Sequence, residues 1–167
     1  MNITSLKDMY IAELQEARSF ESMLKGTLKE MSDKASNPEL QKAFREHSEA
    51  TAEHQRLVEG LISAQAASVD EHTDQGIEAL TTETKKMASF TEGGALRDAG
   101  LIASAQRIEH YEIAVYGTLA SYAKALGLKN DAQILNGILE EEKDTDLILS
   151  DIAEGNITPT IVEAESR

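Results

Sequence analysis

Residues 101–120 read LIASAQRIEHYEIAVYGTLA, and apolar residues recur through this stretch at the spacing of one helix face. Glu109 and Glu112 fall on that apolar face. Burying an unpaired carboxylate costs several kcal/mol. The stretch therefore predicts a core helix that carries acidic groups inward, where they need a compensating partner.

The same conflict recurs in three other segments that have a helical apolar stripe. The inward polar residues of those segments are Glu21, His47, His54 and Glu142. Four helices that each direct such groups inward indicate that something cationic lies between them. A pair of metal ions is the simplest candidate.

The breaks between the periodic segments predict how the helices connect. Helices are expected at about residues 4–31, 38–67, 74–89, 95–126 and 131–154, followed by a short tail element. Short polar breaks join the first two and the last two of these helices, so each pair forms an antiparallel hairpin. A long connection with its own helix joins the two hairpins, which is typical of the ferritin-like four-helix bundle. The sequence therefore predicts an all-α protein with a single ferritin-like domain over residues 1–167.

Capping residues support these boundaries. Thr4 or Ser5 is expected to cap the first helix, and Asn37 is expected to cap the second. Asn130 or Asp131 is expected to begin the last long helix.

Composition narrows the function. The formal charge of −14 argues against binding to nucleic acid or to an anionic membrane surface, because acidic surfaces repel phosphate. The chain has no cysteine, which excludes disulfides and thiolate metal sites and fits a reducing compartment. No stretch has the length and apolar character of a membrane span, and residues 1–10 lack the apolar segment of a signal peptide. We therefore expect a cytoplasmic protein.

The second hairpin fits a carboxylate-bridged pair of metal ions in part. Such a site takes one Glu from each of two helices and a Glu-x-x-His pair from each of the other two. Glu109 and Glu112 have the spacing that places two ligands on one helix face. Glu142 reaches a similar level across the turn, but Thr145 occupies the position where the His would follow. Asp146 can replace that His only if the helix rotates slightly.

The first hairpin is less regular. Glu21 is expected to face the level of residues 50–54 on the next helix. His47 and His54 lie two turns apart on one face, and Ala50 lies between them. Carboxylate oxygens and imidazole nitrogens together suit iron or manganese.

A purely structural interpretation of these residues is the alternative to the metal hypothesis. In a helical protein with 30 acidic residues, a single inward Glu is more often a hydrogen-bonded residue than a ligand. Tyr111, Tyr116 and Tyr122 are interpreted as core residues rather than as a redox relay, and His110 as an outer-face residue. Only the co-occurrence of inward groups on four helices favours a metal site.

One long segment also carries a family resemblance. Residues 103–119, which read ASAQRIEHYEIAVYGTL, closely resemble the YciF-like (YciE/YciF) family of bacterial stress proteins. Residues 96–102, 139–146 and 43–47 are similar to that family as well. The resemblance implies a ferritin-like fold, a homodimer, a di-iron site and a link to stress response.

The resemblance also implies a set of metal ligands. The positions that match the family pattern are Glu21, His47, Glu109, Glu112, Glu142 and Asp146. Relatives commonly have an acidic or amide residue at position 50, so Ala50 removes one ligand. His54 is a candidate to compensate for that loss.

Three functions follow as hypotheses. The first is a di-iron or manganese protein that reacts with oxygen or peroxide. The second is a non-catalytic homodimeric stress or structural protein with an empty metal site. The third is a ferritin-like storage cage, for whose symmetry contacts the sequence gives no signal. All three involve no nucleic acid and no membrane, and partners other than metal ions and a second copy of the chain are not predicted.

Overall fold

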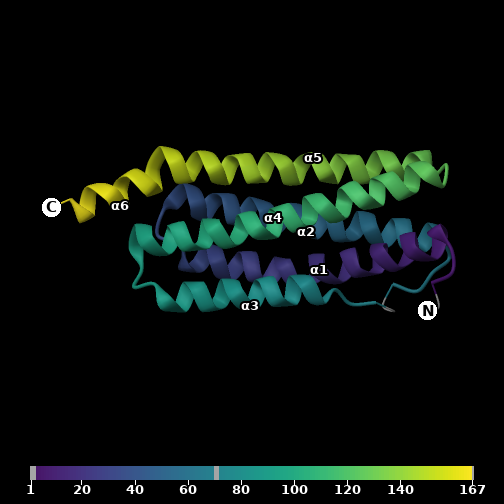
Figure 1. Cartoon of the computed structure of the whole chain (residues 1–167), viewed down its shortest axis with the longest axis horizontal. Helices are drawn as coiled ribbons and strands as arrows, with labels where there is room; N and C mark the ends of the chain where they lie inside the picture. The colour runs from purple at the N-terminus through teal and green to yellow at the C-terminus, as the bar shows by residue number, and fades with distance from the viewer. Residues whose placement is uncertain (1–2, 70–71, 167) are drawn as a thin grey trace.

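The computed structural model describes residues 3–69 and 72–166, and within these ranges the regular secondary structure is entirely helical. Five long helices lie along the long axis of the molecule (Figure 1). In chain order the elements are α1 (Leu6–Lys34), α2 (Pro38–Ala64), α3 (Gln75–Phe90), α4 (Gly94–Ala125), α5 (Lys129–Ile152), the π-helical turn η1 (Ala153–Ile157) and α6 (Thr158–Glu165).

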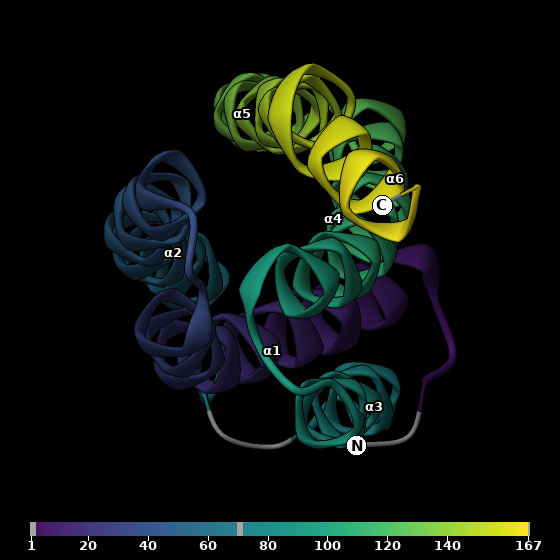
Figure 2. The same ribbon diagram turned by 90° about the vertical axis from the view of Figure 1, so that its left-hand side faces the viewer.

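Four of these helices form the bundle. The hairpin of α1 and α2 packs against the hairpin of α4 and α5, with α1 next to α4 and α2 next to α5. The end-on view shows α3 outside the bundle, where it packs against α1 and α4 (Figure 2). Helices α1 and α5 run in the same direction (Figure 1). The predicted all-α, ferritin-like bundle with a helix in the crossover is confirmed.

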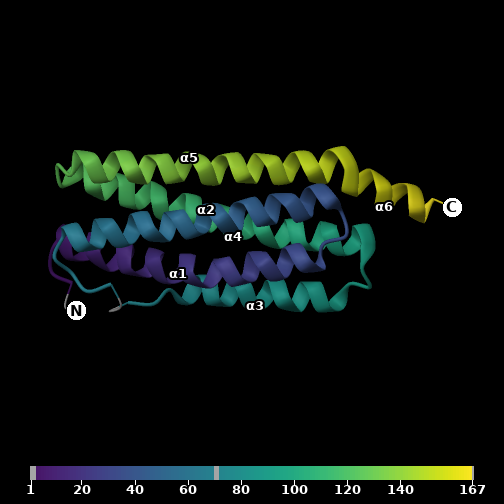
Figure 3. The same ribbon diagram turned by 180° about the vertical axis from the view of Figure 1, so that it is seen from behind.

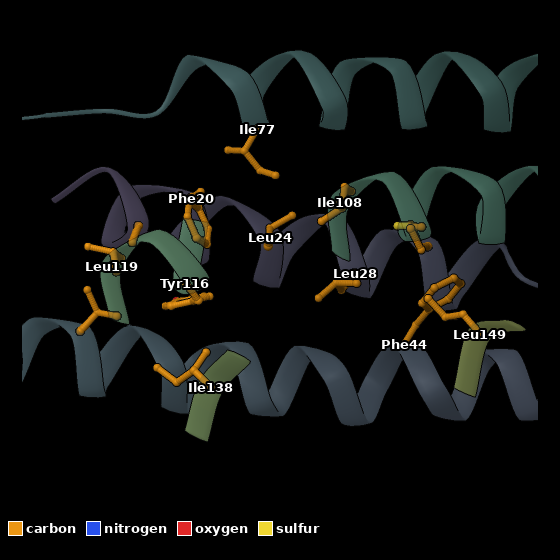
Figure 4. Close-up of a cluster of buried hydrophobic side chains, with 14 of the residues drawn as sticks. Phe20, Leu24, Leu28, Phe44, Ile77, Ile108, Tyr116, Leu119, Ile138 and Leu149 are labelled. Atoms are coloured by element: carbon orange, nitrogen blue, oxygen red, sulfur yellow. The ribbon is translucent and has the colours of Figure 1, made fainter. Parts of the chain in front are cut away.

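The core lies along the bundle axis and is mostly aliphatic. Leucine and isoleucine side chains from all five long helices meet there, with a few aromatic rings (Figure 4). Phe20 packs edge-on against Tyr116, with ring centroids 5.9 Å apart. This packed interior keeps water away from polar groups at the same depth.

Two of the predicted helix starts are confirmed. The Ser5 hydroxyl accepts a hydrogen bond from the backbone N–H of Asp8 at 3.1 Å. The Asn37 side chain accepts from the backbone N–H groups of Glu39 and Leu40 at 2.8 and 3.1 Å. Both side chains satisfy donors that a helix start leaves free.

The start of α5 differs from the prediction. The helix begins at Lys129, and its N-cap residue makes no side-chain capping bond. Asp131 is buried instead, and its Oδ2 accepts hydrogen bonds from the Tyr10 hydroxyl at 3.1 Å and from Gln65 Nε2 at 3.2 Å. This carboxylate therefore joins α5 to α1 and to the residue that follows α2, rather than capping a helix.

The end of α5 lies within two residues of the prediction. The helix ends at Ile152, where about residue 154 was expected, and the short tail element that follows consists of η1 and α6. Pro159 lies in the first turn of α6. The tail therefore remains helical past this proline.

The turn between α1 and α2 is tied to the start of α4. The Asp98 carboxylate accepts from the backbone N–H groups of Ser36 and Asn37 at 2.7 and 2.9 Å. Asp98 is buried, so these bonds fix one hairpin against the other in a region with little water.

Helix α3 approaches α4 closely at one point. A Cβ atom on Gly76 would lie 2.8 Å from the Tyr111 hydroxyl oxygen. Glycine therefore permits the close approach that brings Ile77 into the core.

Candidate metal centre

Six polar side chains converge inside the bundle, from α1, α2, α4 and α5. They are Glu21, His47, His54, Glu109, Glu112 and Glu142. The four carboxylates have no exposed surface, and His54 and His47 are 1% and 5% exposed. The structure therefore brings six of the seven predicted ligands together in a dry interior.

The first group surrounds His47. Its Nε2 lies 3.2 Å from Glu109 Oε1, 3.8 Å from Glu142 Oε2 and 4.0 Å from Glu112 Oε2. One ligand atom from each of these four residues lies within 4.8 Å of all the others. That spacing matches a set of donors around one cation.

The second group surrounds His54. Its Nδ1 lies 2.9 Å from Glu142 Oε1 and 3.8 Å from Glu21 Oε1. Glu142 belongs to both groups, with Oε2 nearer His47 and Oε1 nearer His54. A single carboxylate thus links two adjacent donor sets.

Most of the inward-facing ligand atoms have no hydrogen-bond partner. Within the described residues these atoms include Glu21 Oε2, His47 Nε2, His54 Nδ1 and both carboxylate oxygens of Glu109, Glu112 and Glu142. Buried polar atoms are almost always hydrogen-bonded, so a cluster of orphaned oxygens calls for a missing partner. A cation held among these atoms would give them a common partner.

Burial and like charge alter how these groups titrate. Burial, followed by the negative charge of Glu142, raises the pKa of Glu112 well above its ordinary value. Burial likewise raises the pKa of Glu21 to about 8, against the opposing pull of His54. For Glu109, burial outweighs the charge of His47 and raises the pKa to about 6. Without a cation, the centre therefore retains protons that ordinary carboxyl groups release.

Burial has the opposite effect on the pKa values of the two imidazoles, which it lowers. Burial alone lowers the pKa of His47, but the negative charge of Glu109 and its neighbours raises the pKa to about 9. Burial also lowers the pKa of His54, but the carboxylates of Glu142, Glu21 and Glu141 together outweigh it and raise the pKa to about 9. Metal binding requires a neutral imidazole, so protons must leave both rings when a cation binds.

The donor set fits a pair of divalent cations. Four carboxylates carry four negative charges, which two divalent ions balance. Hard oxygen donors with one imidazole in each group suit iron or manganese. The residues present therefore fit the group that a ferritin-like bundle implies.

Two further residues support the centre, and the sequence analysis did not identify either role. The Tyr116 hydroxyl donates to Glu21 Oε1. Glu141 Oε2 lies 2.9 Å from His54 Nε2, on the side of the ring away from Glu142. Tyr116 follows Glu109 and Glu112 on the same helix face, so that spacing was the available signal. Glu141 is 64% exposed, and nothing in the sequence distinguishes it from other surface acids.

Asp146 is not brought into either group. Its side chain is 19% exposed, and Oδ2 lies 3.5 Å from His110 Nε2 on the outer face of α4. The Thr145 hydroxyl donates to the backbone carbonyl of Glu141 at 3.1 Å, within its own helix. Helix α5 therefore does not rotate to present Asp146 as a substitute for the missing His.

The helices described by the structure give no sign of a membrane segment. None within residues 3–69 and 72–166 combines the length and apolar character that a membrane span requires.

Sequence comparisons relate this bundle to known proteins. The family described as "Domain of unknown function (DUF892)" matches residues 5–161. Protein YciF from Escherichia coli (strain K12) is 37% identical over 158 residues, which cover 94% of this chain and 95% of that protein.

Solved structures agree with the sequence match. The E. coli stress protein YciF superposes with a TM-score of 0.89 at 35% identity, over 93% of this chain and 99% of its own. YcfI from Rhodopseudomonas palustris, for which a structural role has been suggested, gives 0.86 at 27% identity, over 89% and 95%. A protein from Xanthomonas campestris pv. campestris shares the fold with a TM-score of 0.76 at 21% identity, over 98% and 100%. The chain therefore belongs to the DUF892 family and is a relative of the stress protein YciF.

Proposed function

We propose that this protein binds two iron or manganese ions inside the bundle, and that these ions reduce dioxygen or peroxide during stress. The observation that carries the proposal is Glu142, whose two orphaned oxygens face two adjacent groups of buried donors. His47, Glu109, Glu112 and Glu142 would hold one ion, and Glu21, His54 and Glu142 would hold the other. Two such ions, when bound, supply electrons to dioxygen or a peroxide.

The chain contributes orientation and dryness to this site. Tyr116 donates to Glu21 and so fixes one carboxylate oxygen, which leaves the other oxygen free to bind. In the tautomer that carries the proton on Nε2, His54 donates a hydrogen bond to Glu141, and the Nδ1 lone pair then faces inward. The apolar side chains around the centre exclude bulk water, which strengthens electrostatic interactions within it.

Metal analysis tests the proposal directly. Freshly isolated protein is analysed for iron and manganese, and metal-free protein is then titrated with Mn²⁺ and, without oxygen, with Fe²⁺. We expect about two ions per chain with dissociation constants at or below the micromolar range. Protein that contains no metal and binds neither ion at micromolar concentration would contradict the proposal.

A second function is favoured by two positions where ligands are expected and are missing. Ala50 and Thr145 replace potential donors, and YcfI shows that a structural role has been considered for a relative. In a purely structural protein the inward acids are unused. The double variant with Glu109→Gln and Glu142→Gln then has an unchanged or higher stability, since like charges are removed, and no metal content is lost. In the metal protein the same variant loses its ions.

Removal of Glu141 should weaken metal binding without removing any ligand. We expect Glu141→Ala to lower affinity for Mn²⁺ by about 10- to 100-fold, because residues that orient a ligating imidazole have effects of that size. Calorimetric titration measures the change. Glu140→Ala is the matched control, since this neighbour has the same charge and forms only an exposed ion pair with Lys143. Equal affinities in the two variants would show that Glu141 does not act through His54.

A further inference from the structure

A cleft between α2 and α5 reaches the buried centre from outside. Its volume is about 180 Å³, and it is lined by Ala43, Glu46, His47, Ala50, Thr145 and Ile148. His47 is the lining residue that also belongs to the metal centre. The other five residues of the centre are at most 1% exposed, whereas His47 is 5% exposed. The cleft therefore leads to the point at which the centre lies nearest to solvent.

The arrangement of the helices explains why the cleft lies there. Helices α2 and α5 belong to different hairpins, so no short connection holds them together. Helix α3 packs against α1 and α4 and covers that side of the bundle (Figure 2). The view from behind shows α2 and α5 on the side away from α3 (Figure 3). Among the helices that the structure describes, none covers the seam between α2 and α5.

Small side chains keep the cleft open. Ala50 lies between His47 and His54 on one face of α2, and its side chain ends at Cβ. Thr145 lines the opposite wall, where its hydroxyl is already bonded to its own helix. The substitutions that remove two potential ligands therefore also leave space above the centre.

The rim and floor of the cleft limit what can pass. Glu46 at the rim forms an exposed ion pair with Lys42 at 3.3 Å. An exposed, paired carboxylate attracts a passing ligand only weakly. His47 lines the cleft but is only 5% exposed, so little of the centre is open to a bulky organic molecule. Metal ions and oxidants of a few atoms remain as the species that fit.

We propose that the cleft between α2 and α5 is the access route to the metal centre, and that it admits divalent cations and small uncharged oxidants such as hydrogen peroxide. This inference rests on the proposed function, because it assigns a route to the same site. Its distinctive consequence is kinetic. A plug in the route raises the barrier for uptake and for release alike, so rates change while the equilibrium affinity does not.

Two leucine substitutions test the route from opposite walls. Ala50→Leu and Thr145→Leu each fill the cleft with an apolar side chain. Uptake of Co²⁺ by the metal-free full chain is followed by stopped-flow absorbance, and the dissociation constant is measured separately at equilibrium. We expect uptake to slow at least about tenfold in each variant, which corresponds to a barrier higher by roughly 1.4 kcal/mol, with the dissociation constant nearly unchanged. Oxidation of the Fe²⁺-loaded protein by hydrogen peroxide should slow in parallel.

A matched control and the separate readouts distinguish the outcomes. Ala52→Leu makes the same change at an exposed position of α2 outside the cleft, and it should leave the rates unchanged. If Ala50→Leu disturbs the ligands and lowers the affinity for Co²⁺, the rate of Co²⁺ uptake by Thr145→Leu tests the access route instead. Unchanged uptake rates in both cleft variants would overturn the access route while metal binding stands. Failure of the unmodified protein to bind Co²⁺ would instead overturn the proposed function.

Discussion

Glu142→Ala is expected to abolish metal binding at both groups, because one side chain supplies an oxygen to each. Its Oε2 lies 3.8 Å from His47 Nε2 and its Oε1 lies 2.9 Å from His54 Nδ1. The expected metal content falls from about two ions per chain to none at micromolar metal. Elemental analysis after gel filtration, together with calorimetric titration, measures the loss.

Variants at residues of a single group sharpen this test. His47→Ala removes a donor from the first group only, and Glu21→Ala removes one from the second only, so each is expected to retain about one ion. Glu142→Gln keeps the size of the side chain and should show the same loss as Glu142→Ala, which separates charge from packing. Circular dichroism verifies that each variant remains helical. Two ions per chain in Glu142→Ala would refute the bridging role.

The metal-free protein is expected to lose stability as pH rises from about 5 to about 9. In the folded chain the pKa values of Glu109 and Glu21 are raised to about 6 and about 8, from an ordinary value of 4.5. Those of His47 and His54 are raised to about 9 from 6.5. Every one of these groups binds its proton more tightly in the folded state than in the unfolded state.

The sign of the effect follows from these directions. A group whose pKa is raised on folding contributes stability that is fully present below its unfolded pKa and is lost as pH rises through its folded pKa. The total loss is on the order of several kcal/mol, and it corresponds to a fall in Tm of roughly 10 °C for a chain of this size. Thermal unfolding followed at several pH values, in the presence of a chelator, measures it.

Two comparisons isolate the metal centre as the source of this pH dependence. Saturating Mn²⁺ should flatten the curve, because a bound cation takes the place of the retained protons. Glu112→Gln removes one titrating group at constant size and should reduce the slope without metal. A Tm that rises with pH in the chelated protein would contradict the burial of ionisable groups described here.

Periodicity alone predicted much of this centre. The apolar stripes of α1, α2, α4 and α5 placed Glu21, His54, Glu109 and Glu142 inside, and the structure finds all four buried. The reason is physical, since a residue on the apolar face of a bundle helix has no direction to point except inward. The short polar breaks likewise predicted the hairpins.

Contacts between helices from different hairpins were not predictable in the same way. Glu141 touches His54 only because α2 and α5 lie at a particular separation, which no local pattern encodes. The exclusion of Asp146 depends on how α5 is oriented about its own axis, which places this side chain beside His110. The hydrogen bonds of Asp131 depend on the positions of Tyr10 in α1 and of Gln65 just after α2.

The hydrogen bond between Tyr10 and Asp131 has a consequence for the distant centre. Glu21 follows Tyr10 by 11 residues (10 to 21), and Glu142 follows Asp131 by 11 residues (131 to 142). Because α1 and α5 run in the same direction and 11 residues make about three helical turns, each carboxylate lies about three turns beyond its bonded residue, on nearly the same face of its helix. A hydrogen bond roughly 16 Å along the helices from the centre thus helps to fix the relative height of α1 and α5, which carry Glu21 and Glu142.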